Sequence, residues 1–291
     1  MATKREIKNR IKSITSTKKI TSTMEMVAGA KMKKMQQRLG RSAPYEQKLS
    51  LIMSDIVSKG GAGDEPLLKE NENAKNILIF QIAGNRGLCG SYNSHSIEKT
   101  LSLKAKLESE GKKVALYVIG KKGINYYNFS KEPMYKSEAN PEDKITFEDA
   151  AKIGAELTNL FLSGTFDEVY VSYTKVVSAS VQKASFFRLL PVSLDTGSES
   201  VTEEAVVDYE FEPNKERIFS YLLPLYLKVK IFSCFLESGF SEQFLRRVAM
   251  KNAADASGEM IRDLTVSYNR VRQAKITNEI AEIVGGAAAL E

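Results

Sequence analysis

The chain has 291 residues, of which 43% are hydrophobic and 27% charged, and its formal net charge is +6. Its one histidine, His95, and two widely separated cysteines, Cys89 and Cys234, argue against a histidine-based metal site and a disulfide framework. The cysteines are therefore expected to be free thiols in a reducing compartment. No run approaches the ~18–20 continuous apolar residues that span a bilayer, and no apolar core of a signal peptide follows the basic start.

The charge is unevenly distributed along the chain. Residues 1–48, the basic arm, carry thirteen Lys/Arg and three acids, a net charge of +10, so the other residues sum to −4. Such an arm predicts contact with something anionic, which could be nucleic acid, a membrane surface or an acidic protein. The arm also resembles a mitochondrial transit peptide, but lysine outnumbers arginine and the helical pattern continues without a cleavage-like break.

The N-terminal segment has the pattern of a long helix. Its apolar residues follow a repeated spacing of four and three: Ile7, Ile11, Ile14, Ile20, Met24 and Val27. A stripe this narrow is typical of a helix that pairs with another helix. The glycine and proline in residues 40–44 predict a break, after which helix is expected to resume over 47–57 and end at 59–63.

In the middle of the chain the period changes to that of alternating strands and helices. Strands are expected at 77–82, 114–119 and 169–173, with further strand-like segments at 179–183 and near 209–211. Helices are expected over 91–110 and 147–162, with a short one after the second strand. This alternation predicts a mostly parallel sheet covered by helices, in an α/β domain at residues 74–212.

From about residue 213 to 290 the pattern is again helical, and Pro224 is expected to end or kink the helix near its start. A helix this long cannot bury itself in a compact domain and must pair with another long helix. The predicted fold class is therefore α/β: a long antiparallel coiled coil with the α/β domain inserted between its arms. The N-terminal arm is residues 1–60 and the C-terminal arm is residues 213–291.

Few motifs suggest chemistry. The sequence GNRGLCG at residues 84–90 lies between a strand and a helix, but its glycine spacing matches neither a dinucleotide motif nor a P-loop. A tight turn with positive φ is the favoured interpretation. The arginines at 246–247, 270 and 272 fit a solvated helix face, and the Gly/Ala-rich residues 285–289 fit a frayed end. No convergent catalytic set is found, so no catalytic, cofactor-binding or metal residue is predicted.

Both ends of the chain resemble one family. Residues 11–35, IKSITSTKKITSTMEMVAGAKMKKM, resemble the N-terminal helix of the F-type ATP synthase gamma subunit. The glycine turn at 84–90 resembles the first strand-to-helix turn of that family. Residues 241–253 resemble its C-terminal arm, and residues 272–287, RQAKITNEIAEIVGGA, are close to a signature. The likeness covers the whole chain in order.

The resemblance implies a rotor shaft with a Rossmann-like domain, peripheral to the cytoplasmic face of a bacterial plasma membrane, without an active site or cofactor. Its partners would be three alpha and three beta subunits around the coiled coil, with an epsilon subunit and a ring of c subunits at the α/β domain. Proton flow would turn the shaft and cycle the catalytic sites of beta. The basic arm would meet acidic surfaces of beta.

The resemblance also implies roles for individual residues. The implied contacts with beta are Met26, Arg246, Arg272 and Gln273. The residues implied to face the c-ring are Tyr209 and Glu212, and those of the tip, a smooth bearing end, are Gly285, Gly286, Ala287 and Ala288.

Two alternatives come from other classes of protein. The basic arm could belong to a coiled-coil protein that binds nucleic acid, with strongly salt-dependent affinity. The arm lacks interleaved aromatic residues, and its apolar stripe indicates a helix partner instead. The glycine loop could belong to a small nucleotide-binding enzyme, which ATP binding by the isolated chain would distinguish.

Overall fold

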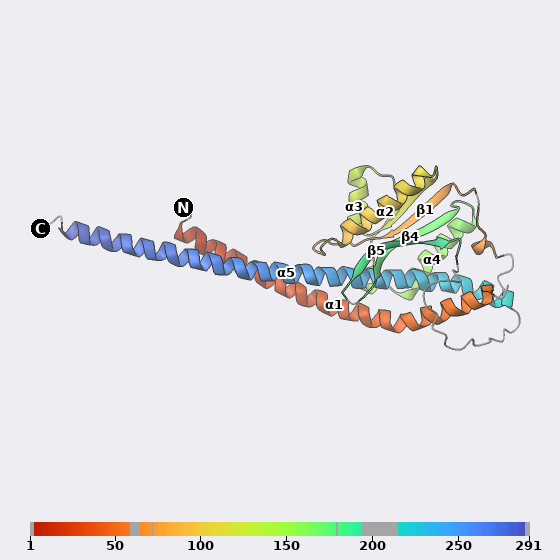
Figure 1. Cartoon of the computed structure of the whole chain (residues 1–291), viewed down its shortest axis with the longest axis horizontal. Helices are drawn as coiled ribbons and strands as arrows, with labels where there is room; N and C mark the ends of the chain where they lie inside the picture. Colours follow the sequence, from red (N-terminus) through yellow and green to blue (C-terminus); the bar gives the residue numbers. More distant parts are fainter. Residues whose placement is uncertain (1–2, 59–64, 72, 179, 194–214, 289–291) are drawn as a thin grey trace. The chain divides into compact units, whose positions relative to one another are not determined.

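The computed structural model describes residues 3–58, 65–71, 73–178, 180–193 and 215–288 (Figure 1). The chain forms two units: a helical unit, residues 1–29 and 246–291, and an α/β unit, residues 30–245. Two long helices, α1 (Lys4–Ser58) and α5 (Lys215–Ala288), contribute residues to both units.

The α/β unit is built on one five-stranded sheet with the order β3-β2-β1-β4-β5. Its strands are β1 (Asn76–Ile82), β2 (Lys113–Ile119), β3 (Lys136–Glu138), β4 (Glu168–Val176) and β5 (Gln182–Leu190). The strand β1 is parallel to β2 and β4, and β2 is parallel to β3, whereas β5 is antiparallel to β4. The expectation of a mostly parallel sheet is confirmed.

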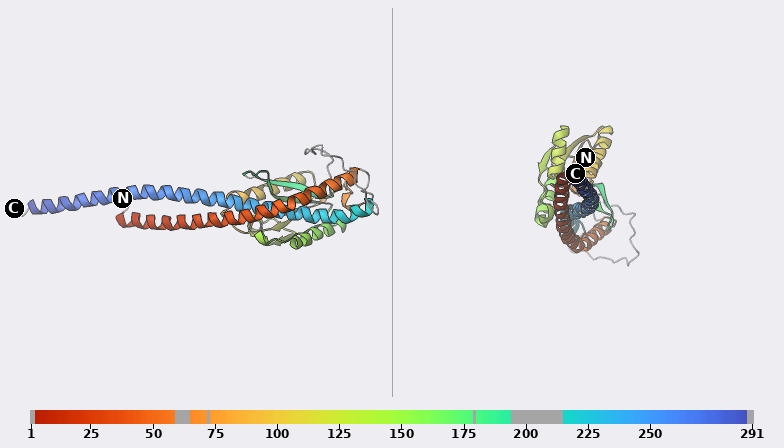
Figure 2. Two further views of the ribbon diagram at one scale, coloured as in Figure 1. Left: turned by 90° about the horizontal axis from the view of Figure 1, so that it is seen from below. Right: turned by 90° about the vertical axis from the view of Figure 1, so that its left-hand side faces the viewer.

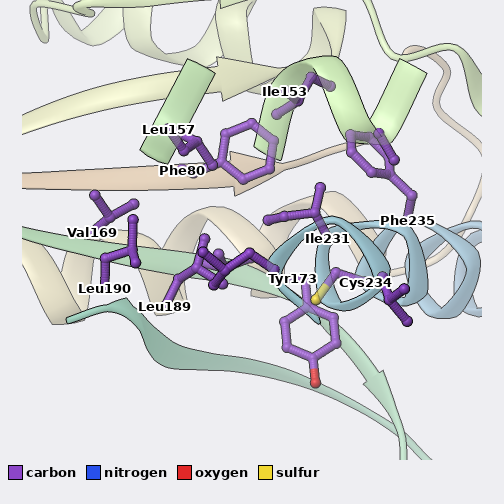
Figure 3. Packing of buried hydrophobic residues seen from close by; sticks show 14 of the residues in the cluster. Phe80, Ile153, Leu157, Val169, Tyr173, Leu189, Leu190, Ile231, Cys234 and Phe235 are labelled. Atoms are coloured by element: carbon purple, nitrogen blue, oxygen red, sulfur yellow. The ribbon is translucent and has the colours of Figure 1, made fainter. Parts of the chain in front are cut away.

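Helices cover both faces of this sheet (Figure 2). On one face α2 (Tyr92–Ser109) and α3 (Lys121–Ser130) pack on alternate strand residues such as Ile79. On the other face α4 (Phe147–Leu162) and the parts of α1 and α5 within this unit enclose a larger core around Phe80. Figure 3 shows this core, in which side chains from β1, α4, β4, β5 and α5 interdigitate. Successive side chains of β1 point to opposite faces of the sheet, and because they are apolar at successive positions, both faces of the sheet are apolar at this strand.

The start of α4 illustrates how the local sequence sets an element boundary. The Thr146 hydroxyl accepts a hydrogen bond from the Asp149 amide at 3.1 Å, and the Asp149 carboxylate accepts one from the Thr146 amide at 3.0 Å. This reciprocal capping box satisfies two of the amides that a helix start leaves without partners. The helix predicted over residues 147–162 is confirmed.

The predicted break of the N-terminal helix at residues 40–44 is wrong, because α1 continues through Pro44 to Ser58. A proline inside a helix costs about 3 kcal/mol, and Gly40 adds a smaller penalty. Core contacts on both sides offset these local costs: Met35 before the proline and Met53 after it are both fully buried. The helix α5 likewise continues through Pro224 instead of ending there.

The strand predictions are partly wrong. Of the segment expected at 179–183, residues 182–183 are the start of β5, which runs from Gln182 to Leu190, whereas residues 180–181 precede the strand and residue 179 lies outside the described residues. The strand β3 was not predicted, because three residues, Lys136–Glu138, give no apolar signal. The segment expected near 209–211 lies outside the described residues.

One described helix could cross a membrane by length and composition alone. Residues Arg217–Gly285 of α5 contain a window with a mean hydropathy of 1.4, of which 44% is buried inside the protein. The sequence expectation rested on continuous apolar runs, which Lys228 and Lys230 interrupt. The apolar side of this part of α5 forms core contacts in the α/β unit, as at Leu223 and Ile231. Packing on the sheet therefore accounts for the hydropathy.

Candidate functional site

In the helical unit, α1 and α5 form an antiparallel pair (Figure 1). The Arg247 side chain lies 3.6 Å from the position of a β-carbon on Gly29, and the Lys18 ammonium lies 3.0 Å from that on Gly258. Further along, the Lys4 ammonium lies 6.0 Å from the centre of the Tyr268 ring. Because residue numbers rise along α1 as they fall along α5, the expected antiparallel coiled coil is confirmed in this unit.

The end of α5 extends beyond its partner helix. Lys4 lies near the start of α1 and already faces Tyr268, so later residues of α5 have no counterpart in α1. Every described side chain from Arg272 to Gly285 is exposed. We call residues 272–285 the unaccompanied end. Its large apolar side chains and their exposed fractions are Ile276 47%, Ile280 57%, Ile283 72% and Val284 62%. Exposed apolar side chains in such density indicate a surface that another protein covers.

The basic side chains of residues 3–29 of the chain are also exposed. Residues 3–29 carry seven Lys/Arg and two acids. None of these seven forms an ion pair with an acid in the described part of the chain. A helix surface with seven cationic and two acidic side chains, whose cations form no ion pair among the described residues, favours an acidic partner.

The residues predicted to contact beta differ in their exposure. Met26 is 67% exposed, and Arg272 and Gln273 are exposed on α5. Arg246 is only 8% exposed and takes part in an interaction within the chain. The helix pairing places Met26 near Met250, about 22 residues from Arg272, or roughly 33 Å along a helix that rises ~1.5 Å per residue. These residues therefore form two separate areas of the helix pair.

The other predicted contact residues are less fully described. Tyr209 and Glu212 lie outside the described residues. Gly285 is exposed in the last turns of α5, with nothing within 4 Å of where a β-carbon would be. Gly286, Ala287 and Ala288 continue the same helix, but their surroundings lie outside what the structure describes.

The glycine turn at 84–90 uses its polar groups inside the chain. The Gly84 amide donates to the Asn93 side chain at 2.9 Å, and the Asn85 side chain donates to the Asn140 carbonyl at 2.7 Å. Positive φ occurs at Gly90, as expected for a glycine, and also at Leu88. The turn therefore joins β1 to α2 through internal hydrogen bonds, which supports the structural interpretation over a phosphate-binding loop.

No group of three or more His, Cys, Asp or Glu side chains able to hold a metal ion comes together among the described residues. Cys89 and Cys234 are both buried thiols that are not joined in a disulfide. Burial raises the pKa of the Cys234 thiol well above its usual value, which disfavours the reactive thiolate.

Sequence reasoning missed a set of buried and half-buried polar residues on α5 in the α/β unit. The Lys230 ammonium lies 2.8 Å from the Glu46 carboxylate of α1. Burial on its own would lower the pKa of Lys230, but the charge and hydrogen bond of Glu46 raise it above the ordinary lysine value. Glu237 and Ser238, further along α5, bind the backbone of β4. In the sequence these residues show only as a polar residue at every turn of an otherwise apolar helix. That pattern by itself cannot be told from a solvated helix face.

The fold defines a class of protein in which two long helices pair with each other in a helical unit and also contribute to the core of an α/β unit. The sequence profile described as "ATP synthase" matches residues 3–290. The ATP synthase gamma chain of Leptospira biflexa is 40% identical over 291 residues, covering all of both chains. That of Streptomyces coelicolor is 38% identical over 292 residues, covering 98% of this chain and 95% of the relative. The chain belongs to the ATP synthase gamma-chain family.

Solved structures agree on the fold. The rotor of the Euglena gracilis mitochondrial ATP synthase has a similar chain with a TM-score of 0.63, 18% identity, and coverage of 94% of this chain and 98% of that one. A chain from the central stalk and c-ring of the Tetrahymena thermophila mitochondrial ATP synthase gives a TM-score of 0.59, with 24% identity and coverage of 80% and 99%. None of these relatives is named as a nucleic-acid-binding protein, and the nucleic-acid alternative gains no support.

Proposed function

We propose that this chain is the central rotor shaft of a bacterial F-type ATP synthase. It couples proton flow through a membrane ring of c subunits to ATP synthesis or hydrolysis at the catalytic sites of the beta subunits, and it has no active site of its own. The observation that carries this proposal is the unaccompanied end, whose exposed apolar side chains require a surrounding protein surface.

The surrounding partner is a ring of three alpha and three beta subunits. An apolar sleeve in that ring would cover Ile276, Ile280 and Ile283, while acidic surfaces of beta would meet the basic arm. Contacts with beta are assigned to Met26, Arg272 and Gln273, which are exposed. Arg246, being buried in the chain itself, acts from inside the helix pair.

The proposed mechanism depends on the shaft making different contacts with each of the three beta subunits. The unaccompanied end is one helix, so its side chains differ around its circumference and present a different face to each of three beta subunits. A ligand or partner shifts a conformational equilibrium only to the extent that it binds the two states differently. Rotation of the shaft therefore moves each beta subunit in turn through states of different nucleotide affinity.

At its other end the shaft is proposed to hold an epsilon subunit and to rest on the c-ring, through the segment that contains Tyr209 and Glu212. This arrangement places the protein at the cytoplasmic face of the bacterial inner membrane as a peripheral subunit. The small tip residues, Gly285, Gly286, Ala287 and Ala288, carry no charge and no long side chain that would bind a fixed sleeve during rotation.

The test is co-expression of this chain with the alpha and beta subunits of its own organism, followed by isolation of the assembly. The expected result is one copy of the chain per three beta subunits, with ATP hydrolysis that is azide-sensitive and depends on the chain. The matched control is the same preparation without the chain. If the chain stays apart from alpha and beta and does not change their ATPase activity, the proposal is wrong.

A further inference from the structure

The strand β4 extends past its neighbour β1. The pairing of β4 with β1 ends at Ser172, opposite Gln81, whereas its pairing with β5 continues to Val176. Backbone groups in a strand point alternately to its two sides, so those of Thr174 and Val176 point to the side where β1 has ended. A buried backbone group without a partner is costly, and some other element must bind these groups.

The helix α5 binds them with side chains. The Val176 amide donates to the Glu237 carboxylate at 2.7 Å, and the Thr174 amide donates to the Ser238 hydroxyl at 3.3 Å. The Ser241 hydroxyl also donates to the Thr174 carbonyl in a longer contact of 3.5 Å. Ser238 and Ser241 are almost completely buried. Three polar side chains within two turns of α5 thus replace the missing strand.

The opposite side of the same turns packs tightly on α1. A β-carbon on Gly239 would lie 2.5 Å from the end of the Met35 side chain, a distance that real β-carbons do not reach. About two turns before Glu237, the Lys230–Glu46 ion pair joins the two helices. The segment 237–241 is therefore held between β4 and α1.

These contacts differ from the apolar packing of α5 on the sheet. Apolar packing such as that of Phe235 and Leu236 is non-directional, whereas hydrogen bonds to a strand edge fix both the rotation of the helix and its position along its axis. Sliding or turning of α5 would leave buried amides of β4 unpaired.

We propose that Glu237, Ser238 and Ser241 form a polar clamp that locks α5 to the sheet, so that torque on the α/β unit turns α5. This proposal rests on the proposed rotor function. In a rotor, α5 experiences torsional load wherever it contacts fixed subunits, and the clamp is the place where its rotation against the sheet is resisted by directional bonds. The three residues are positioning residues and take no part in chemistry.

The test uses the complete ATP synthase, with residue-level hydrogen exchange and with the number of protons pumped per ATP hydrolysed. The disruptive variant is Glu237→Leu with Ser238→Ala. Glu237→Gln retains the acceptor for the Val176 amide. Ser233→Ala is the matched control, because Ser233 is a buried serine on the same helix whose side chain makes no hydrogen bond to a described residue.

In the disruptive variant the amides of Thr174 and Val176 are expected to exchange roughly two- to tenfold faster, the range set by loss of one net hydrogen bond each. Protons pumped per ATP should fall while ATP hydrolysis continues. Ser233→Ala should match the native complex in both readouts, and Glu237→Gln should match it in pumping, with exchange no faster than in the native complex. If the double variant does not assemble, Ser238→Ala alone is compared with Ser233→Ala by the same two measurements.

Unchanged exchange would show that the clamp is absent, and faster exchange with an unchanged pumping ratio would show that it carries no torque. Either result overturns the proposal. A native complex that neither hydrolyses ATP nor pumps protons would instead contradict the proposed rotor function, and that failure is visible before any variant is made.

Discussion

At the scale of single residues, Glu237 is a carboxylate whose surroundings oppose its charge. Burial raises its pKa, the hydrogen bond from the Val176 amide lowers it less, and the nearby charge of Glu46 raises it further, against the attraction of Lys230 and Lys175. The net result is a pKa above the usual value for glutamate. A raised carboxyl pKa means that the ionised form is less stable in the folded chain than in the unfolded chain.

The sign of the pH dependence follows. Above its folded pKa, ionised Glu237 reduces the free energy of unfolding, and this cost disappears as the pH falls through that pKa. Glu237→Gln is neutral at every pH and keeps the acceptor, so near pH ~7 it should be more stable than the native chain, with the difference shrinking on acidification. Thermal denaturation of the full chain across pH measures this. A difference that is constant with pH would contradict it.

Carboxylates whose pKa is lowered do not affect the difference in stability between the native chain and the Glu237→Gln variant. Partial burial on its own would raise the pKa of Asp143, but its hydrogen bond and attraction to Lys31 lower it below the usual value. Such a group stabilises the fold above its unfolded pKa, and this stabilisation is lost as the pH falls through its folded pKa. Because Asp143 is the same in both chains, its contribution cancels from their difference.

At the level of single residues the sequence pattern did not determine exposure. Arg246, which was expected on a solvated helix face, is buried, whereas Arg272 and Gln273 are exposed and their contacts with beta stay predictions. A helical pattern gives the spacing of charges along one helix, whereas burial of a particular arginine depends on what packs around it. Glu237 was missed for the same reason, since its partner, the end of β4, is more than 60 residues away in the sequence.

At the scale of elements, a comparison of two glycines with positive φ distinguishes the cost of backbone strain from the cost of a steric clash. Gly120, just before α3, has φ of +115°, and a β-carbon there would lie 2.2 Å from the Ala83 carbonyl oxygen. Gly111, after α2, has φ of +80° with nothing within 4 Å of a β-carbon. Backbone strain alone costs roughly 1–2 kcal/mol, whereas a clash with backbone must also displace a strand end.

Gly111→Ala should therefore lower the free energy of unfolding by about 1 kcal/mol. Gly120→Ala should lower it by more than about 3 kcal/mol, because the loop after β1 must move away from α3. Denaturant unfolding of the full chain with each substitution measures both values. Equal losses for the two variants would show that strain, and not the contact with Ala83, sets the requirement for glycine at Gly120.

The elements that the sequence predicted well are those whose signal is strong within a single segment. The strand β1 has a continuous apolar run, and α4 has both an apolar face and a capping box. The strand β5 was mostly missed because Lys183, Ser185 and Arg188 interrupt its apolar residues, and its position depends on pairing with β4. The break expected near Pro44 failed because tertiary packing outweighed a local propensity.

At the scale of the whole molecule, the separation of charge leads to a test of how the shaft meets its partners. Lys18 and Lys19 are exposed on α1 and have no acidic partner in the described residues, whereas Lys31 lies 3.1 Å from Asp143 of the α/β unit. Reversal of Lys18 and Lys19 to Glu should weaken coupling between ATP hydrolysis and proton pumping. Each exposed pair is worth only ~0–1 kcal/mol, so the loss should be partial and greatest at low salt.

Lys31 requires a different design, because Lys31→Glu would also place two acids side by side within the chain. Combining Lys31→Glu with Asp143→Lys restores an internal pair with its charges exchanged. If the exchanged pair pumps as the native complex does, the role of Lys31 is internal to the chain. If the exchanged pair remains impaired to the extent of Lys31→Glu alone, the position of the positive charge matters to an outside partner, as the basic-arm interpretation predicts. If ATP-driven pumping is unchanged after reversal of Lys18, Lys19 and Lys31, the basic arm does not contact an acidic surface of beta that matters for coupling. The apolar unaccompanied end would then be the principal contact between the shaft and its partners.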